Sequence, residues 1–381
     1  MDFNFTEEQT MLRDTVARFV SQAYDFDKRR AIITSATGWS ADNWRVFAEE
    51  LGILGAPFSE DLGGLGGGAI ENMIVMEEFG KGLVVEPYLG TVVIGGGFLK
   101  AAGGDVAADV IGQIIEGKAT LAFAWAERQG RFNLADILTT AKKDGDGWVI
   151  NGAKSVVIGA PWASHLIVTA RTSGGQRDAG GVSVFLVDKA DAGVATRDYP
   201  TVDGLRASEI TFENARATLL GEADAGLPLV EQVVDEAIAA LCAEACGAMK
   251  IAHADTVDYA RTRKQFGVPI ASFQVLQHRM VDMFMAYEQS VSMTYMVTLK
   301  LGESALERAK AASAAKVQIG KAGRLIGQDA VQIHGGMGMT EELRVGHYFK
   351  RLTMIETTFG GVDHHLKRYA ALTSGDRIAA E

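Results

Sequence analysis

Hydrophobic residues recur with helical spacing near both ends of the chain. Near the start, residues 6–9 (TEEQ) have the pattern of a capping box, and apolar residues follow at helical spacing. Similar patterns predict helices at 41–51, 69–80 and 105–116. The first part of the chain is therefore predicted to be mainly helical.

From about Thr120 to Glu213 the pattern changes to short apolar runs separated by turn residues. Residues 144–147 (DGDG) predict a hairpin turn. This part is predicted to form a small antiparallel β-domain. The predicted strands are 120–125, 147–151, 155–158, 166–170, 182–187 and 209–212.

After Pro228 the helical period returns, first at 230–241, then at 275–287 and 309–333. We therefore predict an α+β fold that is mostly α. It consists of an N-terminal helical domain (1–118), a central antiparallel β-domain (119–226) and a C-terminal four-helix bundle (227–381).

Composition agrees with a folded globular protein, because 48% of the 381 residues are hydrophobic and 22% are charged. A net charge of −11 argues against nucleic acid and anionic membranes as partners. No apolar run approaches the ~20 residues of a spanning helix, and the start lacks a signal-peptide pattern. We expect a cytoplasmic protein.

The two cysteines, Cys242 and Cys246, lie four residues apart on a predicted helix. Two ligands alone do not close a zinc site. We interpret them as reduced thiols that fill the core, in agreement with a cytoplasmic location.

Two glycine-bearing helix ends are candidate functional segments: residues 263–267 (RKQFG) and 332–338 (QIHGGMG). Basic residues at a helix end also stabilise the helix itself, so the first segment has a purely structural explanation. Glycines in the second allow a ligand to approach the backbone closely. A glycine run at 62–68 is instead interpreted as allowing tight backbone packing.

In this helical, β, helical order, the two segments resemble the acyl-CoA dehydrogenase family. Further anchors are residues 63–66 (GGLG), Glu77-Glu78 and 146–154 (DGWVINGAK), so the resemblance covers essentially the whole chain. It implies the three-domain fold above, tetramers built from dimers, and FAD bound between subunits.

The resemblance also implies residue roles at the cofactor. Arg263 and Gln265 would contact the FAD pyrophosphate of a neighbouring subunit, and Phe266 would pack by its flavin. The residues implied for the adenosine half are Gln332, Gly335 and Gly336, with Gln274 assisting at the adenine.

The family desaturates an acyl-CoA thioester: a buried carboxylate removes the α-proton while the β-hydrogen leaves as hydride to the flavin. Counting from Arg351 puts Gly360 at the position of this base, and an ungapped count from the glycine segment puts Phe359 there. A second position known in the family corresponds to residues 237–238 (AI). Neither position carries a group that takes a proton.

Glu356 is the carboxylate nearest the first position, and we keep it as a weak candidate base. Asp235, Glu236 and Glu244 flank the second position, where solvated or structurally paired carboxylates are the preferred interpretation. The histidines at 334, 347, 364 and 365 are interpreted as packing or surface residues, and no metal site is predicted.

The predicted β-domain departs from the family at the flavin wall. Residues 126–133 (AERQGRFN) replace the usual TEPGAGSD, and 156–158 (VVI) replace WIT. A hydroxyl and an aromatic ring are lost from the wall, whereas the residues offered to a neighbour's FAD remain.

This asymmetry resembles the small, base-less subunit of heteromeric α2β2 members such as the pimeloyl-CoA dehydrogenase pair, which act on bulky or polar acyl-CoAs. We therefore expect an acyl-CoA substrate from fatty acid or steroid side-chain degradation, a second dehydrogenase subunit and an electron acceptor. Two alternatives stay open: a self-sufficient homotetramer that uses a displaced carboxylate such as Glu356, and a flavin-free scaffold.

Overall fold

The computed structural model describes residues 5–374, which form two compact units that interleave along the sequence. Among the described residues, the helical unit comprises 5–31, 69–84 and 238–374. The sheet unit comprises residues 32–68 and 85–237. The predicted domain boundaries near 118 and 226 remain predictions.

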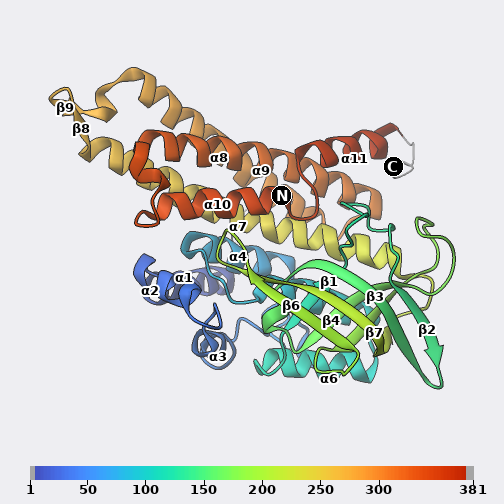
Figure 1. The fold of residues 1–381 in the computed structure, drawn as a ribbon. Coiled ribbons are helices and arrows are strands. Elements are labelled where there is room, and N and C mark those ends of the chain that lie inside the picture. Colours follow the sequence, from blue (N-terminus) through green and yellow to red (C-terminus); the bar gives the residue numbers. More distant parts are fainter. Residues whose placement is uncertain (1–4, 375–381) are drawn as a thin grey trace. The chain divides into compact units, whose positions relative to one another are not determined.

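The helical unit is built from long helices (Figure 1). Its members are α1 (Glu7–Ala23), the start of α2 (Phe26–Thr34), α4 (Ala69–Gly82), most of α7 (Gly226–Thr262), α8 (Gln274–Lys300), α9 (Ala305–His334), α10 (Arg344–Thr357) and α11 (Val362–Ser374). The C-terminal helices predicted from periodicity are confirmed as α7, α8 and α9.

Local chemistry explains where α1 begins and how two helices cross. The capping box is confirmed, because the Thr6 side chain accepts from the Gln9 N–H and the Gln9 side chain accepts from the Thr6 N–H. Helices α4 and α7 touch at glycines: a Cβ on Gly80 or on Gly247 would lie 1.9 Å from a carbonyl oxygen of the other helix. Any larger residue at either position would push the two helices apart.

Helix α7 corrects one expectation from the sequence. It is the one helix among residues 5–374 that is long and apolar enough to cross a membrane, judged by length and composition. Its most apolar stretch is 78% buried, as in the core helix of a globular protein. Cys242 and Cys246 lie on this helix as free, buried thiols, in agreement with the core role predicted for them.

The sheet unit contains a seven-stranded sheet. Strands β4, β2, β3, β7 and β5 pair in a closed ring, β1 adds to β4, and β6 adds to β7. The strands are β1 (Leu121–Ala124), β2 (Thr140–Asp144), β3 (Gly147–Ile158), β4 (His165–Arg171), β5 (Val182–Asp188), β6 (Val194–Pro200) and β7 (Arg206–Leu220). Their inward side chains, such as Ile150, Leu166 and Phe212, form the core.

The predicted hairpin is confirmed, since Asp144 pairs with Gly147 across a two-residue turn. The sheet is not wholly antiparallel, because β1 runs parallel to β4. The two predicted strands at 147–151 and 155–158 form one strand, β3, which contains two register shifts against β7. Such shifts are β-bulges, and they bend the strand and re-aim its side chains.

Shorter elements complete the sheet unit. They are α3 (Ala41–Glu49), the 3-10 turns at Glu60–Leu62 and Ala160–Trp162, a π-helical segment at Leu89–Gly95, α5 (Gly96–Ala102) and α6 (Gly104–Ile115). The glycine run predicted to serve packing does so at Gly64, where a Cβ would lie 2.2 Å from the Phe58 carbonyl oxygen.

Candidate cofactor and active-site segments

The basic segment after α7 forms a β-hairpin that projects from the ends of α7 and α8 (Figure 1). Strands β8 (Lys264–Gln265) and β9 (Val268–Pro269) pair so that Gln265 faces Val268. Phe266 and Gly267 are the two turn residues, with φ of 54° and 82°. Two successive positive φ angles define a type I′ turn.

Phe266 is a poor residue for this turn. Positive φ is unfavourable for a bulky side chain and costs on the order of 1 kcal/mol. The residue is 92% exposed, and within residues 5–374 its one ring contact is edge-on with Phe273 at 6.2 Å between centroids. Its neighbours Arg263 and Gln265 are also exposed. The hairpin therefore presents an aromatic ring, a cation and an amide to solvent without internal contacts that offset the strain.

The glycine segment after α9 lies against the end of α7. His334 stacks on Tyr259 with ring centroids 4.3 Å apart, and the Tyr259 hydroxyl donates to the His334 carbonyl at 3.4 Å. Gly335 ends α9 with φ of 62°. A Cβ on Gly335 or Gly336 would meet nothing within 4 Å, so the backbone there is open to a ligand.

The structure thus brings all seven predicted cofactor residues to one end of the helical unit. Tyr259 lies one turn before Arg263, and it contacts His334 next to Gly335. Gln274 is the first residue of α8 and directly follows Phe273, the ring neighbour of Phe266. Gln332 is exposed on the last turn of α9. Their predicted roles at FAD remain predictions.

The first predicted base position is a tight, buried turn between α10 and α11. Phe359 has φ of 57° and is 8% exposed, and Gly360 has φ of 114°. A Cβ on Gly360 would lie 2.5 Å from the His364 ring. The backbone and the space around Gly360 therefore exclude a side chain, including the carboxylate that a base requires.

Two buried side chains hold this turn. The Lys316 ammonium donates to the carbonyl oxygens of Ile355, Glu356 and Gly360, each at 2.8 Å. His365 bonds the Phe359 carbonyl at 3.1 Å, so its Nε2 carries the proton. Burial lowers the pKa of Lys316 to about 8, and burial also lowers the pKa of His365. The three carbonyls use every proton of the Lys316 ammonium.

Glu356 lies on the last turn of α10, where its carboxylate accepts from Arg324 at 2.6 Å. Its side chain is 13% exposed, and that of Arg324 is 60% exposed. The Arg324 guanidinium thus occupies the carboxylate oxygen that a base would need free. The geometry favours a structural ion pair.

The second predicted base position is also without a proton acceptor. Ala237 and Ile238 are fully buried on α7. Nearby Glu244 forms a bidentate ion pair with Arg351, with distances of 2.5 and 2.7 Å. The interpretation of Glu244 as a paired structural carboxylate is confirmed. Glu236 accepts from Gln232 one turn earlier.

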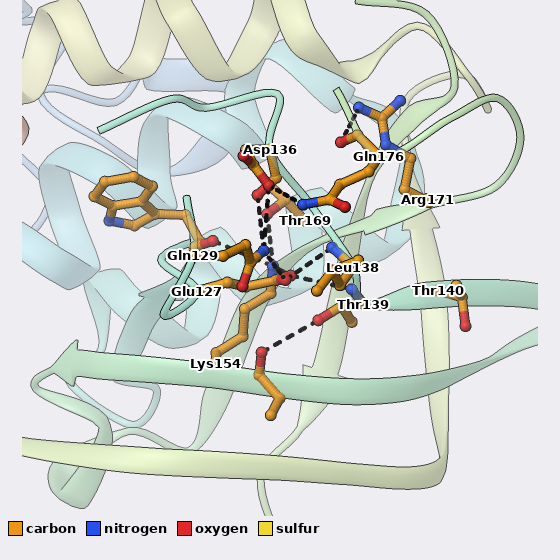
Figure 2. Close-up of polar contacts among 12 residues, drawn as sticks. Glu127, Gln129, Asp136, Leu138, Thr139, Thr140, Lys154, Thr169, Arg171 and Gln176 are labelled. Atoms are coloured by element: carbon orange, nitrogen blue, oxygen red, sulfur yellow. Dashed lines mark hydrogen bonds and ion pairs between the residues drawn. The ribbon is translucent and has the colours of Figure 1, made fainter. Parts of the chain in front are cut away.

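Figure 2 shows the polar network under residues 126–133, the segment that departs from the family at the flavin wall. Glu127 is bonded to the fully buried Lys154 at 2.8 Å and accepts the N–H groups of Leu138 and Thr139. Burial raises the pKa of Glu127, but Lys154 and these donors outweigh it and hold that pKa below its usual range. Glu127 thereby ties the start of the segment to the residues that lead into β2.

Asp136 stabilises the far end of the loop between β1 and β2. Its carboxylate accepts from Gln176 at 2.6 Å and from Gln129 (Figure 2). It also accepts from Arg177 at 2.7 Å. The loop is therefore fixed within the sheet unit by its own side chains.

The other altered segment, 156–158, contains a bulge of β3. Val156 has φ of 52°, which is a rare conformation for a β-branched residue, and its side chain is 50% exposed. Its N–H donates to the Glu209 carboxylate at 3.2 Å. The surface here is aliphatic, as the sequence predicts, and it offers neither an aromatic ring nor a hydroxyl at Val156.

No group of three or more histidine, cysteine, aspartate or glutamate side chains is arranged to hold a metal ion among residues 5–374. Sequence reasoning missed two residues of the site. Tyr259 joins the two cofactor segments, and Lys316 holds the turn at Gly360. A lysine in an alanine-rich, otherwise buried helical stripe was the available signal for Lys316.

Three family models match the chain in order. They describe the acyl-CoA dehydrogenase N-terminal domain (residues 6–105), middle domain (122–215) and C-terminal domain (224–371). The fold and these matches define a flavoenzyme of helical, β and helical parts. The chain belongs to the acyl-CoA dehydrogenase family, whose predicted fold class is thereby confirmed.

Individual relatives agree with this assignment. The CarC subunit of the caffeyl-CoA reductase–Etf complex of Acetobacterium woodii is 30% identical over 312 residues, covering 79% of this chain and 81% of that protein. A solved variant of the Tcur3481–Tcur3483 steroid ACAD has 28% identity and a TM-score of 0.88, covering 97% and 98% of the two chains. The ChsE4–ChsE5 complex from Mycobacterium tuberculosis has 25% identity and a TM-score of 0.89, covering 99% and 100%.

FAD is the cofactor of the family, and the residues present fit part of it. The open backbone at Gly335 and Gly336 and the exposed Arg263 guanidinium suit a pyrophosphate and a nucleoside. The wall formed by residues 126–133 and 156–158 lacks the family's usual groups for the flavin ring. The exposed arginine and the open backbone are thus suited to donate hydrogen bonds to a ligand at the surface of the chain.

Proposed function

We propose that this chain is the base-less subunit of a heteromeric, FAD-dependent acyl-CoA dehydrogenase, and that it completes a composite cofactor site on a second subunit. Its residues Arg263, Gln265 and Phe266 bind the pyrophosphate and flank the flavin. The adenosine half is bound by Gln332, Gly335 and Gly336, with Gln274 at the adenine.

The Phe266 turn carries the proposal. Phe266 is strained and 92% exposed, and beyond the edge contact with Phe273 it makes no ring contact within residues 5–374 that offsets this cost. A cofactor held by another subunit supplies such a contact, because it buries the ring and pairs the nearby cation with phosphate.

The turn at Gly360 explains why a partner is required. Bound FAD would supply the hydride acceptor for the β-hydrogen, but the reaction also needs a carboxylate that removes the α-proton as the hydride leaves. Gly360 has no room for such a group, and Glu356 is already paired with Arg324. In the proposed complex the partner supplies the base and the flavin wall.

Two-component neighbours support a heteromer. ChsE4–ChsE5 is a complex, and the Tcur3481–Tcur3483 steroid ACAD also carries two names. The steroid ACAD favours a bulky acyl-CoA from fatty acid or steroid side-chain degradation. CarC belongs to a complex with an Etf, which favours an electron-transfer flavoprotein as acceptor. The free, buried thiols Cys242 and Cys246 fit the cytoplasmic location that belongs to this proposal.

Flavin absorbance of the purified chain, alone and co-expressed with a dehydrogenase chain that retains a catalytic glutamate, tests the proposal. We expect a colourless or flavin-poor single chain and a yellow complex that reduces an electron acceptor with acyl-CoA. Arg263→Ala in the complex should release most of the flavin, whereas Arg261→Ala, two residues earlier and exposed, should not.

Two results would overturn the proposal in different ways. A single chain that is yellow with one FAD per chain and turns over acyl-CoA is the self-sufficient enzyme. A complex whose flavin does not depend on Arg263 makes this chain a scaffold without a cofactor role.

A further inference from the structure

Tyr259 lies where the two candidate cofactor segments meet, and the proposed function gives it no role of its own. It is on the last turn of α7, in the helical unit. Its carbonyl oxygen accepts the N–H of Arg263 at 2.8 Å, and the Arg263 carbonyl oxygen accepts the N–H of Ile270 at 2.8 Å. The backbone of Tyr259 therefore holds the first residue of the hairpin segment.

The side chain of Tyr259 reaches the other segment. Its ring stacks on His334 with centroids 4.3 Å apart and 26° between the planes, and its hydroxyl donates to the His334 carbonyl at 3.4 Å. His334 is 6% exposed, and its Nδ1 donates to the Ala330 carbonyl at 2.8 Å, which fixes the orientation of the imidazole. Tyr259 thus packs on a fixed ring in the residue directly before Gly335.

Helix α7 also holds the far end of the glycine loop (residues 335–343). Asp255 lies four residues before Tyr259 and therefore on the same face of the helix. It forms a bidentate ion pair with Arg344, the first residue of α10, and the Asp255 side chain is 21% exposed. The glycine loop is thus tied to α7 at both ends, by Tyr259 before it and by Asp255 after it.

These contacts fix the two segments relative to each other before a ligand binds. Arg263 is exposed at the hairpin, and the backbone at Gly335 and Gly336 is open to a ligand. A dinucleotide that contacts both segments would otherwise have to immobilise two independent loops, at a cost in entropy. Because Tyr259 holds one segment through its backbone and the other through its side chain, a substitution of the side chain loosens the connection and leaves the hydrogen bonds of the hairpin in place.

We propose that Tyr259 is a positioning residue that holds the hairpin and the glycine loop at a fixed separation, so that one dinucleotide contacts both. The ring stack contributes most of this effect, because the hydroxyl bond is long. Tyr259 acts through Arg263 and His334 and does not itself contact the ligand. The dinucleotide class of the ligand rests on the proposed function, whereas the connection between the two segments rests on the contacts of Tyr259. No covalent step is involved.

The test compares ADP, whose pyrophosphate and adenosine reach both segments, with adenosine, which reaches only the glycine loop. Each is titrated as a competitor of FAD in the co-purified complex, and flavin fluorescence gives the two inhibition constants. In the wild type ADP should bind about tenfold or more tightly than adenosine, because its phosphates add charge-assisted hydrogen bonds with Arg263. Tyr259→Leu should reduce this ratio about fivefold, because only ADP needs both segments at the correct separation.

Tyr259→Phe keeps the stack and loses only the long hydroxyl bond, so the ratio should stay within about twofold of the wild type. Tyr295→Leu is the matched control. It removes another stacked tyrosine of the helical unit, which packs on Phe5 at 6.0 Å and lies about 30 Å along α8 from Gln274. This control should lower stability in urea without changing the ratio. Tyr259→Gln, which also lacks a ring, repeats the comparison if Tyr259→Leu yields no folded complex.

A ratio that the loss of the ring leaves unchanged overturns the inference, including the case in which ADP and adenosine weaken equally, because Tyr259 would then only support the fold. An equal loss of the ratio in Tyr295→Leu overturns it as well. Flavin content of the same complex tests the proposed function separately: flavin that depends on Arg263, with a ratio that does not depend on Tyr259, sinks only this inference. Flavin that is independent of Arg263, with no competition by either nucleotide, sinks both.

Discussion

Two Phe-Gly pairs in the helical unit share positive φ at both residues but have opposite surroundings. Phe266-Gly267 has φ angles of 54° and 82°, and Phe359-Gly360 has 57° and 114°. Phe266 is 92% exposed, whereas Phe359 is 8% exposed. Gly267 has nothing near its missing Cβ, but Gly360 has the His364 ring at 2.5 Å.

The difference shows where each turn finds its stability. At Phe359 the strain of positive φ is offset inside the chain by burial and by the bonds from Lys316 and His365. At Phe266 the described part of the chain offers only one edge contact, with Phe273, to offset the strain. The Phe359 turn is stabilised by contacts within the subunit. The Phe266 turn lacks such contacts until a ligand or partner binds to it.

The largest effect on stability is expected when a side chain is added to the buried turn at Gly360. Gly360→Glu places a carboxylate at the predicted base position, but φ of 114° and the His364 ring oppose any side chain. We expect a loss of about 2 to 5 kcal/mol in the free energy of unfolding and no acyl-CoA turnover by the single chain. Urea denaturation and an electron-acceptor assay measure the two. An active, stable variant would mean that the turn is plastic.

Removing the cation that holds this turn is expected to cost somewhat less. Lys316→Met leaves three buried carbonyl oxygens without their donor while keeping an apolar stem of similar length. We expect a loss of about 3 kcal/mol in the free energy of unfolding. Lys321→Met, on an exposed position of the same helix, is the control and should remain within about 0.5 kcal/mol of the wild type.

A change in the exposed Phe266 turn should affect flavin binding by the complex with the partner subunit. Phe266→Ala in the co-expressed complex removes the ring without touching the arginine, and we expect flavin affinity to fall about tenfold, or about 1.4 kcal/mol. Flavin release followed by fluorescence during dilution measures this loss. Val275→Ala, another exposed apolar residue near the start of α8, is the comparison. Equal losses in both variants would argue against a specific role for the ring.

The same position should behave in the opposite way in the single chain. Phe266→Asn replaces a residue that is strained at positive φ with one that tolerates it, and it removes an exposed ring. We expect the free energy of unfolding to rise by about 0.5 to 1 kcal/mol. If the variant is more stable as a single chain but loses flavin in the complex, then Phe266 serves binding and not stability. A destabilised single chain would contradict this.

Much of the fold follows from signals within a few residues of one another. The capping box at Thr6, the long C-terminal helices and the turn before Gly147 are local patterns, and the structure confirms them. Strands β2 and β6 escaped prediction because they are short and mostly exposed, so they lack an apolar run. The parallel pairing of β1 with β4 depends on contacts more than forty residues apart, which no local pattern encodes.

In the candidate site, too, local patterns could be predicted from the sequence and contacts between distant residues could not. Glycine and basic residues marked both cofactor segments, but their meeting through Tyr259 and His334 is a tertiary contact. The empty base position was predicted from Gly360, yet its cause, the His364 ring against a backbone at positive φ, appears only in three dimensions.

The smallest effect on stability and turnover is expected at Glu356. This variant tests whether catalysis takes place at the buried turn near Gly360. Glu356 is four residues before Gly360 and paired with a half-exposed Arg324, so Glu356→Gln should lower the free energy of unfolding by no more than about 1 kcal/mol. Turnover by the complex should stay within about twofold of the wild type, because a group that accepts no proton contributes nothing to the transition state. Arg324→Gln, which breaks the same pair from the other side, should match it in stability and in rate. If Glu356→Gln instead abolished turnover while flavin stayed bound and Arg324→Gln did not, the displaced base would exist, and the buried turn rather than the exposed one would be the site of catalysis.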